Sequence, residues 1–185
     1  MAGDPTFTNI WLGGDAYCAP VGTTGVTDVT TAWPAAWKAL GLLSDEAGLT
    51  QTREEDSNDY YAWGGVLVRT VRSKHKRTFT VTAIEDNDTI FKLLNPGSTS
   101  TATAGVTTRV VKVPGSDVRA FGFETRDGAI TSRLLIPRGE VTAVGDLVRV
   151  ETDLSSAELT VTVYPAADGT LFREVTNAPG AVPAA

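Results

Sequence analysis

The residues best suited to catalysis are scarce in this chain, which has one His and one Cys among 185 residues. A Ser-His-Asp or Cys-His site would therefore have to use His75, because such a nucleophile needs a base beside it. His75 lies in the run RSKHKR, where neighbouring cations disfavour the protonated imidazole and no acidic residue is close in sequence. We interpret His75 as an exposed residue at the tip of a hairpin over 73–76, not as a catalytic base.

Metal and cofactor motifs are not found either. A structural zinc site needs a full set of Cys or His ligands, which one residue of each type cannot supply. The run EDNDT (85–89) resembles part of a calcium loop, but Phe91 stands where such loops need Gly, so helix capping explains these residues better. No phosphate loop, dinucleotide fingerprint or GxSxG motif occurs. The sequence thus predicts no catalytic residue, no metal, no cofactor and no enzyme activity.

The charge balance limits the classes of partner that the chain is expected to bind. The chain holds 16 Lys and Arg against 22 Asp and Glu, a net charge of −6, which argues against a general DNA-binding protein. A single Cys excludes an intrachain disulfide, and MAGDPTFTNIW lacks the pattern of a signal peptide. No stretch approaches the roughly 20 apolar residues of a membrane span. We expect a protein made and kept in a reducing cytoplasm, or assembled from there.

Any functional residues must be positioned mainly by strands. RTFTVTAIE (77–85) puts apolar residues on one face and threonines on the other, and ELTVTVY (158–164) repeats this period of two. Asp127-Gly128 and Asp168-Gly169 separate such runs, and this dipeptide is typical of hairpin turns. The pattern predicts an antiparallel β-sandwich or barrel, with further strands at 48–55, 65–72, 107–113, 117–126, 129–136, 146–152 and 170–175.

Other segments predict less regular structure. EDNDTIFKLLNPG (85–97) indicates one short helix at about 85–95 that packs on the sheet. A second helical turn is plausible at 34–40. Trp33 and Trp37 are expected to anchor the core. The run NPGSTSTATAG predicts a mobile loop. We expect a single domain over 1–176, including an extended loop at about 50–64, followed by a flexible tail over 177–185.

An asymmetry of charge and aromatic residues remains to be explained. Residues 45–59 are acidic and residues 69–77 are basic, while the aromatic residues near 60–63 fall on an expected loop, where their apolar area needs a cover. Two interpretations stay open: two solvated surfaces, or complementary faces of neighbouring subunits in a self-assembling ring. In the second, the contact residues are Glu54, Glu55, Asp56, Asp59, Tyr60, Tyr61, Trp63, Arg72, Lys74, Lys76 and Arg77.

The order of features over about residues 7–95 resembles a known family. A Trp precedes a Leu-Gly pair, then Ser-Asp-Glu, a Gly, an acidic stretch, a Trp-Gly-Gly that enters a Val-rich strand, and a strand that ends in Glu before a short helix. These features are Trp37, Leu40-Gly41, Ser44 to Glu46, Gly48, Glu54 to Asp56, Trp63 to Gly65, and Glu85 to Leu94. In this order they resemble the major tail tube proteins of long, non-contractile-tailed bacteriophages.

The resemblance implies a β-sandwich or barrel of the tail tube type with a flanking helix. It implies subunits that close into hexameric rings and stack into a hollow tube in the phage tail, where DNA passes without specific binding. A long early loop, here 50–64, would grip the adjacent ring. Tape measure, tail terminator and tip proteins are the implied partners. The alternative function is a β-sandwich module that binds a receptor or decorates a capsid, and fold analogy alone does not separate such functions.

Overall fold

The computed structural model describes residues 7–147 and 149–178. Strands dominate it, all pairing is antiparallel, and there is one short helix, α1 (Asp88–Leu94), so the predicted mainly β fold is confirmed. Eight strands form one sheet in the order β2-β1-β7-β8-β9-β4-β3, with β10 paired to β8. Their bounds are β1 (Gly13–Pro20), β2 (Lys38–Ala39), β3 (Thr50–Tyr61), β4 (Leu67–Ala83), β7 (Arg119–Asp127), β8 (Ile130–Val144), β9 (Ala157–Val163) and β10 (Arg173–Thr176). A separate hairpin holds β5 (Thr99–Thr103) and β6 (Val106–Val110).

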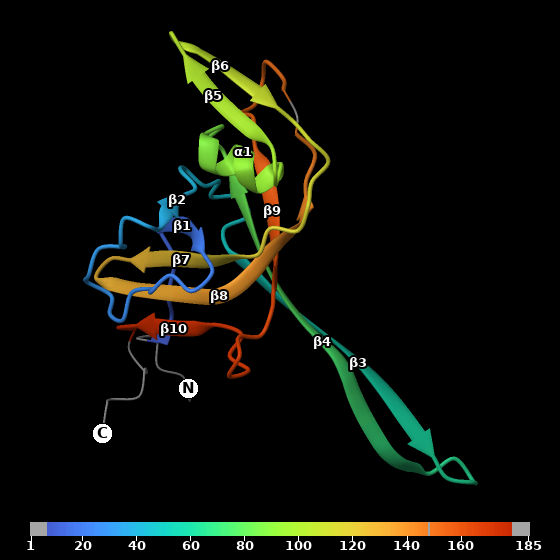
Figure 1. Cartoon of the computed structure of the whole chain (residues 1–185). Coiled ribbons are helices and arrows are strands. Elements are labelled where there is room, and N and C mark those ends of the chain that lie inside the picture. The colour runs from blue at the N-terminus through green and yellow to red at the C-terminus, as the bar shows by residue number, and fades with distance from the viewer. Residues whose placement is uncertain (1–6, 148, 179–185) are drawn as a thin grey trace.

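The long strand β8 divides the sheet into two layers. Its first half pairs with β7 and, over Ser132–Leu135, with β10, whereas its second half, from Gly139, pairs with β9. Figure 1 shows the first layer, β1, β7, the start of β8 and β10, crossing the direction of the second layer, which holds β9, β4 and β3. A strand that passes from one layer to the other in this way is typical of orthogonal β-sandwiches.

The main core lies between these layers. Phe121 and Phe123 of β7 face Phe79 of β4, and all three side chains are almost completely buried. The alternation predicted for 77–85 and 158–164 is confirmed, because the apolar residues of both strands are buried. Helix α1 packs on this core, and the Asn87 side chain caps it by accepting a hydrogen bond from the Ile90 amide at 3.0 Å.

A second apolar cluster covers the outer face of the first layer, where residues 21–37 lie across β1, β7 and β8. Trp37 is buried there, and Trp33 stacks on Tyr17 with ring centroids 4.6 Å apart, so both tryptophans act as the predicted anchors. The predicted helical turn at 34–40 is wrong: the Trp37 amide bonds the Pro34 carbonyl in a single turn, and β2 follows at once. Pairing of Lys38 and Ala39 with β1 outweighs the helical propensity of this short segment.

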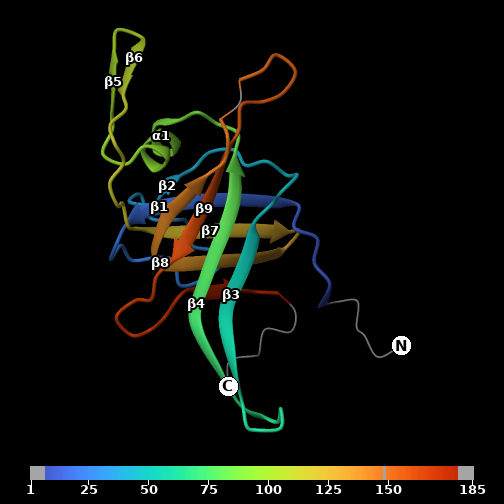
Figure 2. The ribbon, with the colours of Figure 1, turned by 90° about the vertical axis from the view of Figure 1, so that its right-hand side faces the viewer.

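Strands β3 and β4 form a hairpin that extends far beyond both layers (Figures 1 and 2). The expected loop at 50–64 is therefore mostly strand, and the predicted hairpin tip at 73–76 is wrong. The turn lies at Ala62–Val66, where Gly64 and Gly65 adopt the positive φ values of 93° and 81°. Residues 73–76 lie inside β4, next to a β-bulge at Glu54–Asp56. Neither face of the outer hairpin is buried, so no hydrophobic alternation marks it as strand.

Several smaller expectations also differ from the structure. The expected mobile loop at 95–105 contains β5 and the Ala104-Gly105 turn of a Thr-rich hairpin, consistent with the strand propensity of Thr. Described residues of 146–152 form no strand, and β1 and β2 were not predicted. Asp127-Gly128 does turn a hairpin, but the strand after Asp168-Gly169 pairs with β8 instead of β9. Residues 179–185 of the expected flexible tail lie outside the described residues. Among the residues that the structure describes, no helix is long and apolar enough to span a membrane.

Candidate assembly surface

Charged side chains pair across the β3–β4 hairpin. Lys74 Nζ lies 2.8 Å from an Asp56 carboxylate oxygen, and Lys76 Nζ lies 3.8 Å from one of Glu54. Exposed pairs of this kind contribute about 0–1 kcal/mol each. Acidic and basic residues that we expected to meet between subunits thus contact each other within one chain, and a role for them between subunits stays a prediction.

His75 lies in the middle of β4, and its side chain is partly exposed. Its Nδ1 atom lies 2.8 Å from a Glu55 carboxylate oxygen, which also accepts hydrogen bonds from Arg53. The Arg53 guanidinium and then the His75 imidazole hold the pKa of Glu55 below its usual value. This pair was not apparent from the sequence, because Glu55 and His75 are 20 residues apart. No group of three or more metal-ligating residues occurs among the described residues.

The aromatic residues that we expected on a loop lie at or beside the hairpin turn. The side chains of Tyr60 and Tyr61 are more than half exposed, and Trp63 is as exposed as in an extended chain. Val66 and Leu67, on the other side of the turn, are exposed as well. Figure 2 shows that this end of the hairpin lies away from both layers. An apolar cluster of this size that the described residues leave uncovered is typical of a protein–protein contact.

The remaining predicted site residues have varied surroundings. Asp59 accepts a hydrogen bond from the Thr70 hydroxyl at 2.6 Å, across the hairpin. The Arg77 guanidinium lies over the Phe172 ring, 5.5 Å from its centroid, at the root of the hairpin. Arg72 has no ion pair within the described part of the chain. The hairpin therefore brings all the predicted contact residues together on one element, although it disperses them along its length.

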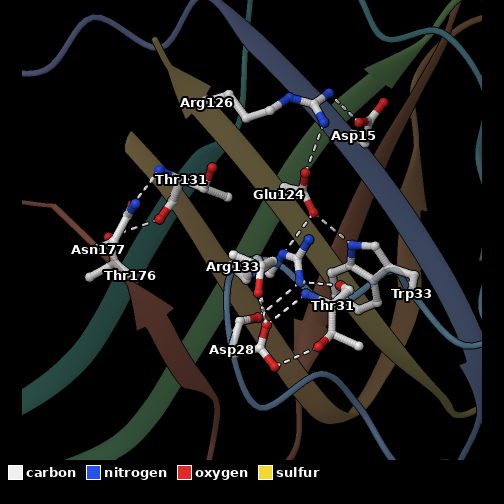
Figure 3. A network of polar contacts seen from close by, with 11 residues as sticks. Asp15, Asp28, Thr31, Trp33, Glu124, Arg126, Thr131, Arg133, Thr176 and Asn177 are labelled. Carbon is white, nitrogen blue, oxygen red and sulfur yellow. Dashed lines mark hydrogen bonds and ion pairs between the residues drawn. The ribbon is translucent and has the colours of Figure 1, made fainter. Parts of the chain in front are cut away.

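A buried polar network in the first layer was missed by the sequence analysis (Figure 3). Glu124 and Arg133, opposite each other on β7 and β8, are both buried and form an ion pair of 2.8 Å. Glu124 also accepts hydrogen bonds from the Trp33 indole and from Arg126, both at 2.8 Å. Arg133 donates to the backbone carbonyls of Asp28 and Thr31 at 2.9 and 2.7 Å. The network holds the segment around residues 28–33 against the sheet.

Counting residue pairs outward from a turn centred on Asp127-Gly128 would have placed residue 124 opposite residue 131. In the structure Asp127 pairs with Ile130, so the register places residue 124 opposite residue 133, and this shift hid the ion pair from the sequence analysis. Opposite charges at directly facing positions stabilise antiparallel strands. A buried pair whose partners are all present is tolerated, whereas loss of one partner costs about 3–5 kcal/mol. The network is accordingly a structural support.

The comparison with protein families shows which family the chain belongs to. A family model described as phage tail tube protein matches residues 1–185. The chain belongs to the phage tail tube protein family. This family is structural, so the chain is a component of the virion tail that assembles into a multi-subunit tube and is not an enzyme. The resemblance found in the sequence is confirmed.

Two further comparisons complete this result. One similar solved structure is the sheath-tube complex of an extracellular contractile injection system, PVC, in its extended state. The sequences are 8% identical, the match covers 89% of this chain and 88% of that chain, and the TM-score is 0.47. A comparison with curated proteins gives no match.

We expect replacement of Trp63 with Ala to leave the folding of the isolated subunit unchanged. The exposed indole makes no core contact, so the free energy of unfolding should change by at most about 0.5 kcal/mol. Trp37→Ala is the matched control, because this buried residue should cost about 3–5 kcal/mol. Urea denaturation of both variants measures the difference. A large loss of stability in Trp63→Ala would place this residue in the core.

The Glu55 pairing should make the hairpin less stable in acid. Since the pKa of Glu55 is lowered in the folded state, its pairing contributes stability above the usual value of 4.5, and this contribution is lost as pH falls through the folded-state pKa. Glu55→Gln should remove part of the pH dependence, whereas Glu46→Gln, at an exposed residue without an ion pair in the described chain, should not. Hydrogen exchange of β3 amides between pH 7 and pH 3, corrected for intrinsic rates, tests this. An unchanged pH profile in Glu55→Gln would contradict it.

Proposed function

We propose that this tail tube protein closes into hexameric rings, that the rings stack into a hollow tube, and that phage DNA passes through this tube into the host. The family match supports a tube-forming role. The observation that best supports ring closure is the pair of free edges on the second layer. The six-fold number rests on the resemblance to tail tube proteins of non-contractile phages.

The free edges lie on opposite sides of the second layer. Among the described residues, β3 pairs with β4 along one edge and has no strand along the other, and β8 beyond Gly139 pairs with β9 alone. Unpaired backbone N–H and C=O groups along such edges form a template for pairing with another chain. One copy therefore offers a different edge at each side, as a heterologous ring contact requires.

The number of strands between these edges suits a closed ring. The second layer runs β8-β9-β4-β3, with antiparallel neighbours throughout. The layer has an even number of strands and neighbouring strands run in opposite directions, so the edge strands β3 and β8 are antiparallel to each other. When a rotation about the ring axis relates two copies, β3 of one copy therefore runs opposite to β8 of the next copy. Antiparallel pairing then continues from copy to copy without a reversal. Ring closure would remove both edges.

Charge supports the passage of DNA. Each subunit has a net charge of −6, and a ring repeats that charge around its axis. A wall of like charge repels phosphate groups and allows DNA to slide, whereas a basic wall would hold it. In this arrangement a tape measure protein fills the lumen during assembly, and terminator and tip proteins close the ends. Synthesis takes place in the host cytoplasm.

Proline substitution on β3 tests ring closure. Adjacent backbone N–H groups of a strand point to opposite sides, and proline removes the N–H of the residue that it replaces. Of the variants Thr52→Pro and Arg53→Pro, one therefore loses an N–H that faces the free edge, and the other loses an N–H that faces β4. We expect the first of these variants to fold with a normal circular dichroism spectrum but to form no rings in electron micrographs. The second serves as the control for lost hairpin pairing. A well-folded proline variant that still forms normal tubes would contradict pairing through β3.

Assembled tubes should bind duplex DNA poorly at physiological salt. The expected result is weak binding without the steep salt dependence that phosphate contacts produce. Filter binding or fluorescence anisotropy with tubes, over a range of salt concentrations, measures it. Tight, strongly salt-dependent binding to intact tubes would contradict an acidic lumen.

A further inference from the structure

A pocket of about 220 Å³ lies at the root of the hairpin, between the two layers. Its apolar lining includes Leu43, Leu49, Val81 and Phe123, together with Trp11 and Leu12 from the segment before β1. The Trp11 and Leu12 side chains are 44% and 79% exposed, so this rim of the pocket offers apolar area to a partner. An apolar concavity with polar groups at its edge is the usual form of a binding site for a side chain.

The charges at this pocket are acidic. Asp45 lines it, and Glu46 follows on the same loop; both are exposed and neither has an ion pair within the described residues. Two other acids of the lining, Asp15 and Glu124, are already paired with Arg126. The net unpaired charge at the mouth therefore comes from Asp45 and Glu46.

The tip of the hairpin has the complementary composition. Tyr60, Tyr61 and Trp63 supply exposed aromatic area, and the exposed Arg69 and Arg72 have no ion pair among the described residues. Aromatic residues and Arg are the residue types that most often dominate the binding energy of protein interfaces. The basic residues farther down the hairpin, Lys74 and Lys76, already pair with acids of β3. Asp59, which accepts a hydrogen bond from Thr70, also has no ion pair among the described residues, so Arg69 and Arg72 leave the tip with a net positive charge. Asp45 and Glu46 are the unpaired charges at the pocket.

We propose that the root pocket receives the hairpin tip of a second copy of this chain, with Trp63 in the apolar part and Arg69 and Arg72 facing Asp45 and Glu46. This inference rests on the proposed function, to which it adds the receptor site and the spacing between rings. Each copy carries both a tip and a pocket, so the contact is heterologous and repeats from ring to ring without closing. Opposite charges would set the orientation of the tip as it docks.

Two larger concavities fit the tip less well. One, of about 310 Å³, has both Asp168 and Arg173 in its lining, so its charges balance. The other has a volume of about 410 Å³ and lies between α1, β6 and the loop before β9. Its acid Asp86 is paired with Arg109, and Arg149 is a further cation at its lining that has no ion pair in the described chain. Arg149 would repel Arg69 and Arg72, and unfavourable contacts of this kind select against a wrong partner. Charge therefore favours the root pocket.

The length of the hairpin predicts the spacing of the stack. The tip and the pocket are separated by strand β3, whose 12 residues span about 40 Å at about 3.3 Å per residue. If the tip of one copy occupies the root of the next, neighbouring rings are one hairpin length apart. Electron micrographs of tubes should therefore show an axial repeat of about 40 Å.

A shortened hairpin tests this spacing. Asn58 pairs with Val71 and Asp59 with Thr70, so deletion of these four residues removes two complete cross-strand pairs. The deletion preserves the register of the hairpin, the face of the strand on which each remaining side chain lies, and the docking residues Arg69 and Arg72. The repeat should fall by about 7 Å. The full-length chain is the control. Tubes of the shortened chain with an unchanged repeat would overturn the inference.

Chemical cross-linking tests the site itself. In a Cys18→Ala background, Ala62→Cys at the tip is combined with Ala47→Cys, which lies in the chain between the pocket residues Asp45 and Gly48. In the matched control, Leu147→Cys at the pocket beside α1 replaces Ala47→Cys. A short bifunctional maleimide cannot connect residues 62 and 47 of one chain, since a full hairpin length separates them. Assembled tubes of the 62–47 pair should give a ladder of cross-linked multimers, and tubes of the 62–147 pair should not.

The outcomes separate this inference from the proposed function. If the Cys18→Ala chain and the unmodified chain form no rings or tubes, the proposed function fails and this inference fails with it. If tubes form and the 62–47 pair gives no ladder, or the 62–147 pair gives one instead, only the docking site is wrong. Charge exchange adds a further check: Arg69→Glu should shorten the tubes, and Asp45→Arg in the same chain should restore them. Failure of this rescue in well-folded protein would also overturn the proposal.

Discussion

The structure depends on the hydrogen-bonded continuity of β4, which is buried at one end and exposed at the other. From Thr78 to Ala83 the strand pairs with β9, as far as Thr80 also with β3, and its apolar side chains belong to the main core. From Leu67 to Arg77 it pairs with β3 alone and projects outward. Burial of the inner part holds the direction of the outer part, so the core positions aromatic residues that make no contact with it. A flexible loop of the same composition would lose more conformational entropy on docking.

The second layer is therefore both a wall of the core and a source of unpaired edges. Its inner face is covered by the first layer, and its outer face carries threonines such as Thr80 and Thr160, which are only partly buried and whose hydroxyl groups lie 3.3 Å apart. The first layer is covered on both sides, by the main core and by the segment around Trp33 and Trp37. The Glu124–Arg133 network keeps this segment in place without leaving a buried charge unpaired.

The sequence was informative where burial differs between the two faces of a strand. Phe79, Val81 and Leu159 belong to strands with a clear period of two, and these strands were predicted correctly. The outer hairpin is exposed on both faces, so alternation carries little signal there. Strands were predicted at 48–55 and 65–72, but the stretch up to residue 64 and residues 73–76 were interpreted as a loop and a hairpin tip. Strand β1 contains small residues and is largely covered on both faces, which hides the same signal. The candidate contact residues were selected by residue type, and their role in a contact stays a prediction. Cross-strand pairing decides which of their charges remain free for a partner.

The β-bulge at Glu54–Asp56 has a consequence for the timing of assembly. There β3 and β4 shift register, and Lys74 opposite adopts a positive φ of 54°. Bulges increase local twist and interrupt an edge as a template for pairing. If subunits pair through this edge as proposed above, the interruption disfavours chance pairing of two isolated subunits. Addition to an existing assembly, where several contacts form together, is then favoured over spontaneous nucleation in solution.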